Sequence, residues 1–444
     1  MRVRNRELLA LLPASLLLTA GFAGVFIQRS NQLSTVSLTY GAIFLGLCLA
    51  GHVFLRVTLP HADPYMYPLA AALASIGIVM IYRIDETLAR QQAQWFVLGL
   101  VVFAATIVLF RDYRRLERYR YSIAIVSLLL LVLPRLPGIG YQANGAYLGI
   151  RIPGLFVFQP AEFSKIGLII FLASYLRDTR QAMVIGARRV LGITIPPLKH
   201  MGPIAVIWGF AMAVMVLLSD MGSSLMLYGG LLAMLYVATS RASFATIGLL
   251  AFAVGAWYIG AHVSHVHARV EDWLHPFNTR LYNAPLGSYQ IANAQFAQAA
   301  GGLFGQGFGQ ATLTIPGSHP AAPLLPYAQT DMIYAVIADE LGLFGAAAVL
   351  ITYLLFVARG FKTAILARDS FSTLLALGLA TVFALQVFVI VGGVTRVIPL
   401  TGVTLPFVAY GGSSIVANFV LLALLLLISD RARKPASHAP ARAR

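Results

Sequence analysis

Long apolar runs alternate with short polar segments along almost the whole chain. A bilayer core requires about 20 consecutive apolar residues per helix, and shorter runs are tolerated in large bundles. Twelve runs fit this description, so the pattern predicts an all-α, polytopic membrane protein with about twelve transmembrane helices. The predicted spans are Leu8–Gln28, Val36–Leu55, Tyr67–Tyr82, Trp95–Phe110, Tyr121–Leu133, Pro160–Leu176, Met201–Leu218, Ser223–Ala238, Phe244–Ala261, Met332–Val357, Leu374–Val391 and Phe407–Ile428.

The composition supports a membrane protein, and the distribution of Lys and Arg along the chain shows where the positive charge lies. The 444 residues are 59% hydrophobic and 11% charged, whereas a soluble domain carries about 25% charged residues. The net charge of +16 comes mainly from Lys and Arg in alternate connecting segments, and such an excess marks cytoplasmic loops. We therefore predict that both termini are cytoplasmic and that the basic residues contact anionic membrane lipid, not nucleic acid. The tail, residues 431–444, is predicted to be disordered.

This orientation places the longest polar segment, residues 262–331, on the extracytoplasmic face. The one cysteine, Cys48, lies in an apolar run, which excludes a disulfide framework and a cysteine-based metal site. His262, His265 and His267 lie close together, but no acid completes a recognisable set, so no metal site is predicted.

An acidic cluster stands where the long polar segment meets the tenth predicted span. Asp331, Asp339 and Glu340 lie within ten residues of each other. An acid in a membrane helix is costly and usually faces the bundle interior or a water-filled cavity. Asp331 is therefore the candidate reactive group, although a helix-capping role also fits its position. The two deeper acids require basic partners in the interior. The candidate partners are Lys165, Arg269 and Arg396.

Two more polar motifs fall on the same face. Glu162 and Lys165 are three residues apart at the start of the sixth predicted span, so a helix places them on one side. They either form a charge-neutralising pair or line a substrate cavity in which Lys165 meets a phosphate. Asp220 lies in the short turn before the eighth span, where a helix cap and a catalytic acid both fit.

The entry to the last span, between Arg396 and Ser414, is rich in Pro and Gly. This pattern predicts a broken helix that lines a cavity and does not face lipid. Arg396 is a candidate for binding a pyrophosphate there.

Four sequence motifs follow each other along the chain in a characteristic order. They are Phe158–Lys165, Pro285–Gln290, Thr330–Gly345 and Pro399–Ser414. Together they resemble the SEDS family of peptidoglycan glycosyltransferases (RodA, FtsW and SpoVE), with RodA the nearer type. The family core has ten helices. The resemblance therefore divides the chain into two additional N-terminal helices (1–58), a core (59–430) that contains the 262–331 loop, and the tail (431–444).

The family carries an essential acid in a His-Thr-Asp-Phe motif, which reads Gln329-Thr330-Asp331-Met332 here. Asp331 thus resembles the catalytic aspartate. The resemblance implies polymerisation of lipid II into glycan strands at the outer face of the bacterial cytoplasmic membrane, for elongation and cell shape or for division. The residues expected to bind the substrate are Gln159, Glu162, Lys165, Asp220, Arg269, Thr330, Glu340, Arg396, Ser413 and Ser414.

The resemblance also implies a partner, a class B penicillin-binding protein that cross-links the new glycan. No dedicated cofactor site follows from the sequence, but a divalent cation, Mg²⁺ or Mn²⁺, stays open as an aid to the basic residues in stabilising the departing pyrophosphate. Two other classes of function compete. A lipid II flippase fits the intramembrane charges and broken helices, but the polar motifs gather on one face and no inverted repeat is visible. A scaffold for a partner synthase leaves the four ordered polar motifs unexplained.

Overall fold

The predicted membrane helices are all present in the computed structural model, which describes residues 3–30, 35–143, 146–152, 156–186, 188–190, 193–195, 198–284, 287–315 and 323–435. Each predicted span coincides with one helix. These helices are α1 (Val3–Ser30), α2 (Thr35–Thr58), α3 (Met66–Ile84), α4 (Glu86–Leu109), α5 (Arg120–Val132), α6 (Ala161–Ile185), α7 (Leu198–Leu217), α8 (Met221–Thr239), α9 (Ala242–His262), α13 (Ile333–Leu366), α14 (Ser370–Val394) and α15 (Gly412–Arg433).

Within the described part of the chain, 10 of these helices are long and apolar enough to cross a membrane. The two exceptions have separate causes. Helix α5 has only 13 residues, and α6 carries Glu162 and Lys165 near one end and Arg177, Asp178 and Arg180 near the other. Both still pack inside the bundle beside the other helices, so the protein is a multi-pass, all-α membrane protein.

The connecting segments contain short elements that the hydrophobic pattern did not predict. An antiparallel sheet joins β1 (Gly140–Ala143), β2 (Ala146–Ile152) and β3 (Phe156–Phe158). A hairpin joins β4 (Arg188–Val190) and β5 (Ile193–Ile195). The segments η1 (Tyr113–Tyr119) and η2 (Leu133–Arg135) are 3₁₀ helices. Strands this short give too little alternation to be recognised in a sequence.

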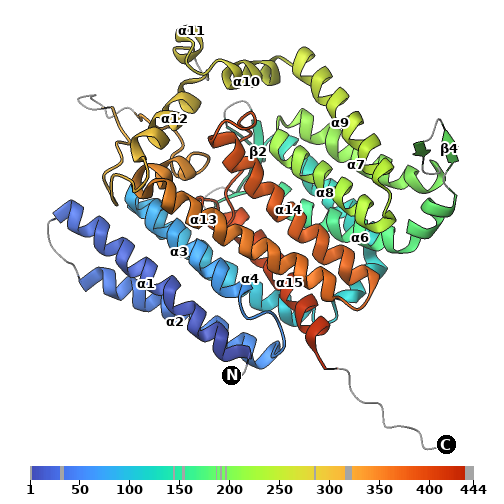
Figure 1. Ribbon diagram of the computed structural model, residues 1–444, viewed down its shortest axis with the longest axis horizontal. Coiled ribbons are helices and arrows are strands. Elements are labelled where there is room, and N and C mark those ends of the chain that lie inside the picture. The colour runs from blue at the N-terminus through green and yellow to red at the C-terminus, as the bar shows by residue number, and fades with distance from the viewer. Residues whose placement is uncertain are drawn as a thin grey trace, which may run out of the picture.

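The bundle surrounds α14 and α15, with α1 and α2 at one edge and α7, α8 and α9 at the other (Figure 1). The long 262–331 segment forms α10 (Ser264–Leu274), α11 (Thr279–Tyr282) and α12 (Tyr289–Gly301) at one end of the bundle. The N-terminus and the end of α15 lie at the opposite end. Both termini therefore share a side, and its assignment to the cytoplasm stays a prediction. The tail beyond residue 435 lies outside the described residues.

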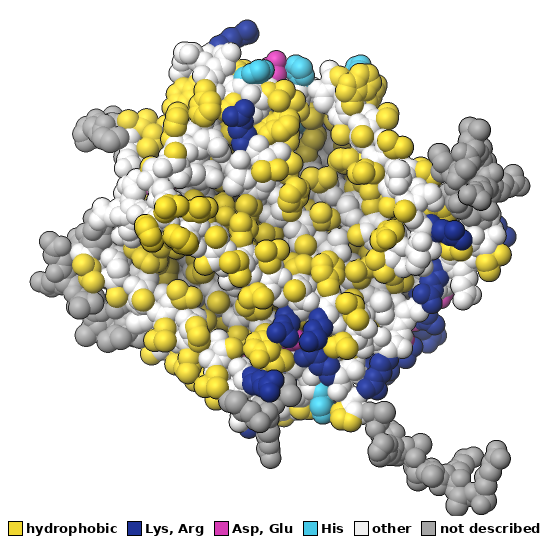
Figure 2. Space-filling model, viewed as in Figure 1, with side chains coloured by type: hydrophobic (Ala, Val, Ile, Leu, Met, Phe, Trp, Pro, Cys, Tyr) yellow, Lys and Arg dark blue, Asp and Glu magenta, His cyan; other side chains and the backbone are white. Residues whose placement is uncertain are grey.

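The surface agrees with a membrane setting. Figure 2 shows hydrophobic side chains across the middle of this face, while most Lys and Arg side chains gather towards the end that holds the N-terminus. Cytoplasmic ends of membrane proteins carry such an excess.

The last span begins later than predicted. Phe407 has φ +63°, and α15 starts only at Gly412. The segment before it is irregular, as the Pro and Gly pattern indicated, and is held inside the bundle, where Tyr353 donates a hydrogen bond to the Pro406 carbonyl at 2.6 Å. Phe407 also packs edge-on against Phe419, with ring centroids 5.3 Å apart. Irregular backbone at this depth is tolerated because it is buried in protein.

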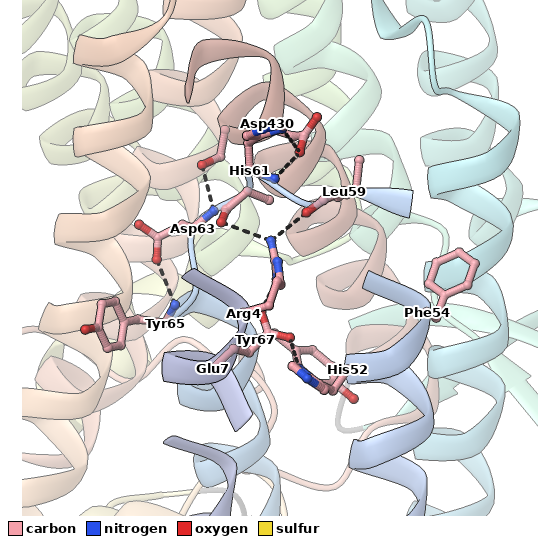
Figure 3. A network of polar contacts seen from close by, with 12 residues as sticks. Arg4, Glu7, His52, Phe54, Leu59, His61, Asp63, Tyr65, Tyr67 and Asp430 are labelled. Carbon is pink, nitrogen blue, oxygen red and sulfur yellow. Dashed lines mark hydrogen bonds and ion pairs between the residues drawn. The ribbon is translucent and has the colours of Figure 1, made fainter. Parts of the chain in front are cut away.

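A buried polar network joins the N-terminal helix pair to the rest of the bundle (Figure 3). Arg4 forms an ion pair with Glu7, and the Glu7 carboxylate also accepts from His52 Nδ1 at 2.7 Å. The Arg4 guanidinium donates to the carbonyls of Leu59 and Ala62 at 2.7 and 3.0 Å. This network holds α1 and α2 against the loop that leads into α3.

The same loop is tied to the end of α15. The backbone N–H of His61 donates to Asp430 at 2.8 Å, and that of Asp63 donates to Ser429 at 3.0 Å. Asp63 also forms an ion pair with Arg433. Helices α1 and α2 therefore share one hydrophobic core with the later helices.

Candidate functional site

A cavity of about 450 Å³ lies beneath α10 and α12, beside the start of α13. We call it the Asp331 cavity. Two irregular pieces of chain complete its wall: the turn before α8 and residues 400–402. The polar side chains that line it belong to Ser219, His265, Arg269, Asp272, Tyr289, Gln290, Tyr327 and Asp331.

The turn before α13 fixes the position of Asp331. Tyr327 has φ +58°, and its carbonyl accepts hydrogen bonds from the backbone N–H groups of Thr330 at 3.0 Å and Met332 at 3.1 Å. The Gln329 carbonyl accepts from the backbone N–H of Tyr410 at 2.8 Å. The turn is thus held both locally and by the irregular segment before α15.

Asp331 does not cap α13. The cap position belongs to Met332, and no side chain makes a capping hydrogen bond there. Asp331 is half-buried, and its carboxylate makes no hydrogen bond or ion pair with another residue of the described chain. The capping alternative is therefore excluded, and the carboxylate is left free to act in the cavity.

Burial dominates the electrostatics of Asp331. Loss of water raises the pKa of its carboxyl to about 6, against the opposing effect of the Arg269 guanidinium. Burial also raises the pKa of Asp272 to about 6, with a further contribution from the negative charge of Glu271, while Arg269 again opposes it. A carboxyl with a pKa near the working pH is a better proton acceptor than an ordinary, more acidic one. Raised carboxyl pKa values in a cleft are typical of functional sites.

Arg269 acts electrostatically on both carboxyls and still has a hydrogen-bond donor without a partner. Its buried Nη1 atom has no hydrogen-bond partner among the described residues. A buried guanidinium N–H without a partner is costly, and a phosphate oxygen would satisfy it in a geometry that Arg favours. The predicted binding residue Arg269 and the candidate reactive group Asp331 therefore share one cavity.

Five predicted binding residues lie instead in a buried polar network next to this cavity. Lys165 Nζ donates to Glu162 and to Gln386, each at 2.7 Å. The Gln386 amide donates to the Thr404 carbonyl at 2.9 Å. The Thr404 hydroxyl in turn donates to Ser414 at 2.8 Å. The network thus extends from α6 through α14 to the start of α15.

One further hydrogen bond adds Gln159 and Ser413 to this network. The backbone N–H of Gln159 donates to the Ser413 hydroxyl at 2.9 Å. Glu162 and Lys165 are only 2% and 3% exposed. None of the five residues lines the Asp331 cavity, so the geometry agrees with the charge-neutralising interpretation of this pair, and their substrate-binding roles stay predictions.

Asp220 and Thr330 are engaged by local backbone. Asp220 accepts a hydrogen bond from the backbone N–H of Ser223 at 3.0 Å and so caps α8. Thr330 donates to the Tyr327 carbonyl at 3.3 Å. Both lie next in sequence to a residue that lines the cavity, Ser219 and Asp331 respectively.

Glu340 has a different partner from those predicted. Its Oε1 atom lies 3.0 Å from Arg83 Nε on α3, so the expectation of Lys165, Arg269 or Arg396 was wrong. The reason is that α13 packs against α3, which places Glu340 beside Arg83. Helix α13 is also kinked at Gly342, where φ is +65°. The kinked helix packs against residues 301–309 at a distance from the Asp331 cavity.

The glycine-rich segment after α12 is close-packed against this kink. The backbone N–H groups of Gln306 and Gly307 donate to the carbonyls of Asp339 and Glu340, both at 2.9 Å. A Cβ at Gly305 would lie 2.2 Å from the Glu340 carbonyl oxygen, so only glycine allows this approach. Glu340 therefore belongs to a structural contact.

Arg396 holds the end of α10. Its guanidinium donates to the carbonyls of Trp273 at 2.9 Å and Leu274 at 3.1 Å, and the Trp273 indole donates back to the Arg396 carbonyl at 3.0 Å. Arg396 does not line the Asp331 cavity. It instead positions the helix that carries Arg269 and Asp272.

Asp272, Tyr289, Gln290 and Tyr327 line the cavity but were not among the predicted site residues, whereas Arg269 was. His265, Arg269 and Asp272 follow a spacing of four and three, which places them on one face of a helix. That spacing was a usable signal for Asp272. Tyr289, Gln290 and Tyr327 carried no such signal, because only the folded loop brings them to the cavity. The described residues contain no group of three or more His, Cys, Asp or Glu that could hold a metal ion.

Residues 65–434 match the family of cell cycle proteins that comprises FtsW, RodA and SpoVE. The chain belongs to this family. The peptidoglycan glycosyltransferase RodA of Mycobacterium leprae is 40% identical over 448 residues, which cover 98% of this chain and 92% of that protein. A probable peptidoglycan glycosyltransferase FtsW of Geobacter metallireducens is 32% identical and covers 82% of this chain and 93% of its own.

Solved structures share the fold. One, described as structural coordination of polymerization and crosslinking by a peptidoglycan synthase complex, has a TM-score of 0.65 and 26% identity. It covers 84% of this chain and 99% of its own. The match to the FtsW, RodA and SpoVE family begins after α2, so α1 and α2 precede the shared part.

Proposed function

We propose that this protein is a peptidoglycan glycosyltransferase that polymerises lipid II, with Asp331 as the general base. The observation that carries the proposal is the half-buried carboxylate of Asp331, which has no partner among the described residues, in a cavity shared with Arg269, whose buried Nη1 atom likewise has no hydrogen-bond partner there. The names of the FtsW, RodA and SpoVE relatives support the reaction class, and the greater identity to the RodA relative favours a role in elongation and cell shape.

The chemistry needs a proton acceptor and a site for a departing pyrophosphate. Asp331 takes the proton from a hydroxyl of the acceptor sugar as that oxygen attacks the anomeric carbon of the donor. The bond between this carbon and the pyrophosphate oxygen breaks, and the electron pair leaves with the pyrophosphate. Arg269 binds the charge that develops on it.

The setting also fits this reaction better than transport. The Glu162–Lys165 pair and its neighbours are fixed to each other by hydrogen bonds, and the cavity lies at the α10–α12 end of the bundle. We assign that end to the extracytoplasmic face, where the polar disaccharide-peptide would remain while the lipid tail stays in the bilayer. The relative in a peptidoglycan synthase complex supports a transpeptidase partner of the class B penicillin-binding type.

The test is glycan formation from lipid II by the purified protein together with its partner transpeptidase. General-base assistance is typically worth about 10²–10⁴-fold, so Asp331→Asn should lower the rate by at least about 10²-fold. Asp112→Asn is the matched control, because Asp112 is exposed and lies in the short connection between α4 and η1. Full polymerisation by Asp331→Asn would remove Asp331 from the reaction. No polymer from the folded wild-type complex would overturn the enzyme proposal itself.

A further inference from the structure

A second cavity, of about 280 Å³, lies between α1, α2, α3 and α4. Its buried wall is almost entirely apolar and aromatic. This wall is formed by Leu18, Phe22, Phe44, Ile78, Tyr82 and Phe96. Its rim includes the exposed side chains of Ile43 on α2 and Val97 on α4. The cavity therefore opens sideways between α2 and α4, onto surface that a bilayer covers, and we call it the α1–α4 pocket.

The surroundings determine what fills this pocket. Water requires two to four polar partners at a buried site, and the apolar wall does not supply them. An empty pocket would forfeit the dispersion contacts of all the side chains around it. The mouth faces the bilayer, where hydrocarbon chains are the nearest apolar groups, and a chain can enter without crossing water.

The rim also carries a charge. Arg90 lines the mouth and is exposed, one turn beyond Glu86, with which it pairs at 2.6 Å. An exposed pair of this kind contributes little stability, so the guanidinium is available for a phosphate oxygen. Arg90 and Val97 are separated by about 10 Å along the helix at 1.5 Å per residue. A phosphate at Arg90 would therefore lie above a hydrocarbon chain that runs down into the pocket.

The turn of α4 that carries Arg90 also contacts residues 409–411, which in turn hold the segment before Asp331. On its other face, Gln92 donates to the Ala409 carbonyl at 3.2 Å and accepts from the backbone N–H of Gly411 at 3.3 Å. Gln91 accepts from the Tyr410 hydroxyl at 2.5 Å. The backbone N–H of Tyr410 donates to Gln329, two residues before Asp331. This turn of α4 is thus linked to the turn before α13 through residues 409–411.

We propose that the α1–α4 pocket binds one acyl chain of a membrane phospholipid, with the lipid phosphate on Arg90. The bound lipid restrains the turn of α4 that holds residues 409–411. Six of the 14 residues that line the pocket come from α1 and α2, which precede the part of the chain that matches the FtsW, RodA and SpoVE family. The site is therefore a consequence of the added helix pair.

The test uses the full-length protein in nanodiscs of phosphatidylethanolamine and phosphatidylglycerol. A small fraction of the phosphatidylglycerol carries a photoactivatable diazirine in its acyl chain, and labelled peptides are identified by mass spectrometry. We expect labelling of Ile43, Phe44 and Val97 to exceed that of the lipid-facing α9 residues Leu249 and Leu250 by about tenfold, a preference equivalent to about 1.4 kcal/mol.

Two variants separate a specific site from general contact with lipid. Ala93→Trp fills the mouth of the pocket and should abolish the excess labelling, whereas Val254→Trp, on the exposed face of α9, should leave it unchanged. Equal labelling of the pocket and of α9, or labelling that Ala93→Trp does not change, would overturn the proposal. Displacement of the probe by an equimolar polyprenyl phosphate, but not by unlabelled phospholipid, would also overturn it in favour of an isoprenoid occupant.

The restraint on residues 409–411 is tested by amide hydrogen exchange. Arg90→Gln should lose most of the pocket labelling and should speed exchange in the peptide that contains Tyr410 and Gly411. Exchange in a peptide from the middle of α14 should not change. Loss of the lipid without faster exchange at Tyr410 would refute the restraint.

Discussion

Gly402 lies against the carboxylate of Asp331: a Cβ at this glycine would stand 3.6 Å from Asp331 Oδ2. Gly402 also has φ +73°, a conformation that other residues adopt at a cost. The glycine therefore shapes the wall of the Asp331 cavity at the atom proposed to accept the proton.

Replacement of this glycine should affect the site more than the fold. Gly402→Ala should cost about 1–2 kcal/mol of stability for the left-handed backbone and should reduce the rate of glycan formation, because relief of this backbone strain would move the loop that forms the cavity wall beside Asp331. Thermal unfolding and polymerisation are measured together. Gly209→Ala on α7, where an added Cβ meets no other atom within 4 Å, is the control. An unchanged polymerisation rate in Gly402→Ala would show that the loop does not position the base.

The dependence of the rate on pH should report Asp331. The base works only when ionised, so kcat/KM should rise as the pH increases through about 6, the pKa that burial gives this carboxyl. The Arg269 charge lowers this pKa. Arg269→Gln should therefore move the rise to higher pH, in addition to lowering the plateau through lost binding of pyrophosphate. Arg280→Gln, an exposed change in the same loop, should keep the wild-type midpoint. A shift to lower pH in Arg269→Gln would contradict the assignment.

The Glu162–Lys165 pair offers a test of structure against substrate binding. Lys165→Met leaves a buried carboxylate without its partner, which should destabilise the protein by about 3–5 kcal/mol. The double variant Glu162→Gln, Lys165→Met should recover much of that loss, because neither charge remains buried. If the pair is purely structural, the double variant also recovers polymerisation. A stable double variant that makes no glycan would instead assign the pair to the substrate.

Arg396 should act through α10. Arg396→Lys keeps the charge but cannot reproduce the planar contacts with the Trp273 and Leu274 carbonyls. We expect a loss of about 1–3 kcal/mol in stability and a displaced α10, seen as faster hydrogen exchange in the peptide that contains Trp273. Arg115→Lys, an exposed change elsewhere, is the control. A variant with wild-type exchange but a raised KM for lipid II would point to direct contact with the pyrophosphate.

The helices were predictable because each is specified by its own run of residues. An apolar run such as Leu374–Val391 forms a helix in a membrane whatever its neighbours, and the structure places α14 there. The expected irregular entry to the last span was equally local, since Pro and Gly disfavour regular helix. The residue at which this irregular segment ends and α15 begins could not be placed from sequence. The start of α15 at Gly412 depends on how Phe407 packs against Phe419.

Contacts between residues far apart in the chain were harder to predict from the sequence. The partner of Glu340 is Arg83, more than 250 residues earlier in the chain, and no local pattern links them. The motif around Asp331 identified the reactive carboxylate as a candidate, but its neighbours Tyr289 and Tyr327 reach it only through the path of the loop. The catalytic role of Asp331 itself stays a prediction. The prediction that Glu340 pairs with Lys165, Arg269 or Arg396 was wrong because charge alone does not define proximity.

The Arg4–Glu7–His52 network has a consequence for the assembly of the protein in the membrane. Arg4 and Glu7 are one helical turn apart, so the buried charges neutralise each other as soon as α1 forms. His52, the second partner of Glu7, arrives with α2. Residues Ser429 and Asp430, which fasten the 59–63 loop to α15, are synthesised last. The first two helices thus contain their own electrostatic partners and can insert as a hairpin, while their attachment to the bundle waits for the final helix.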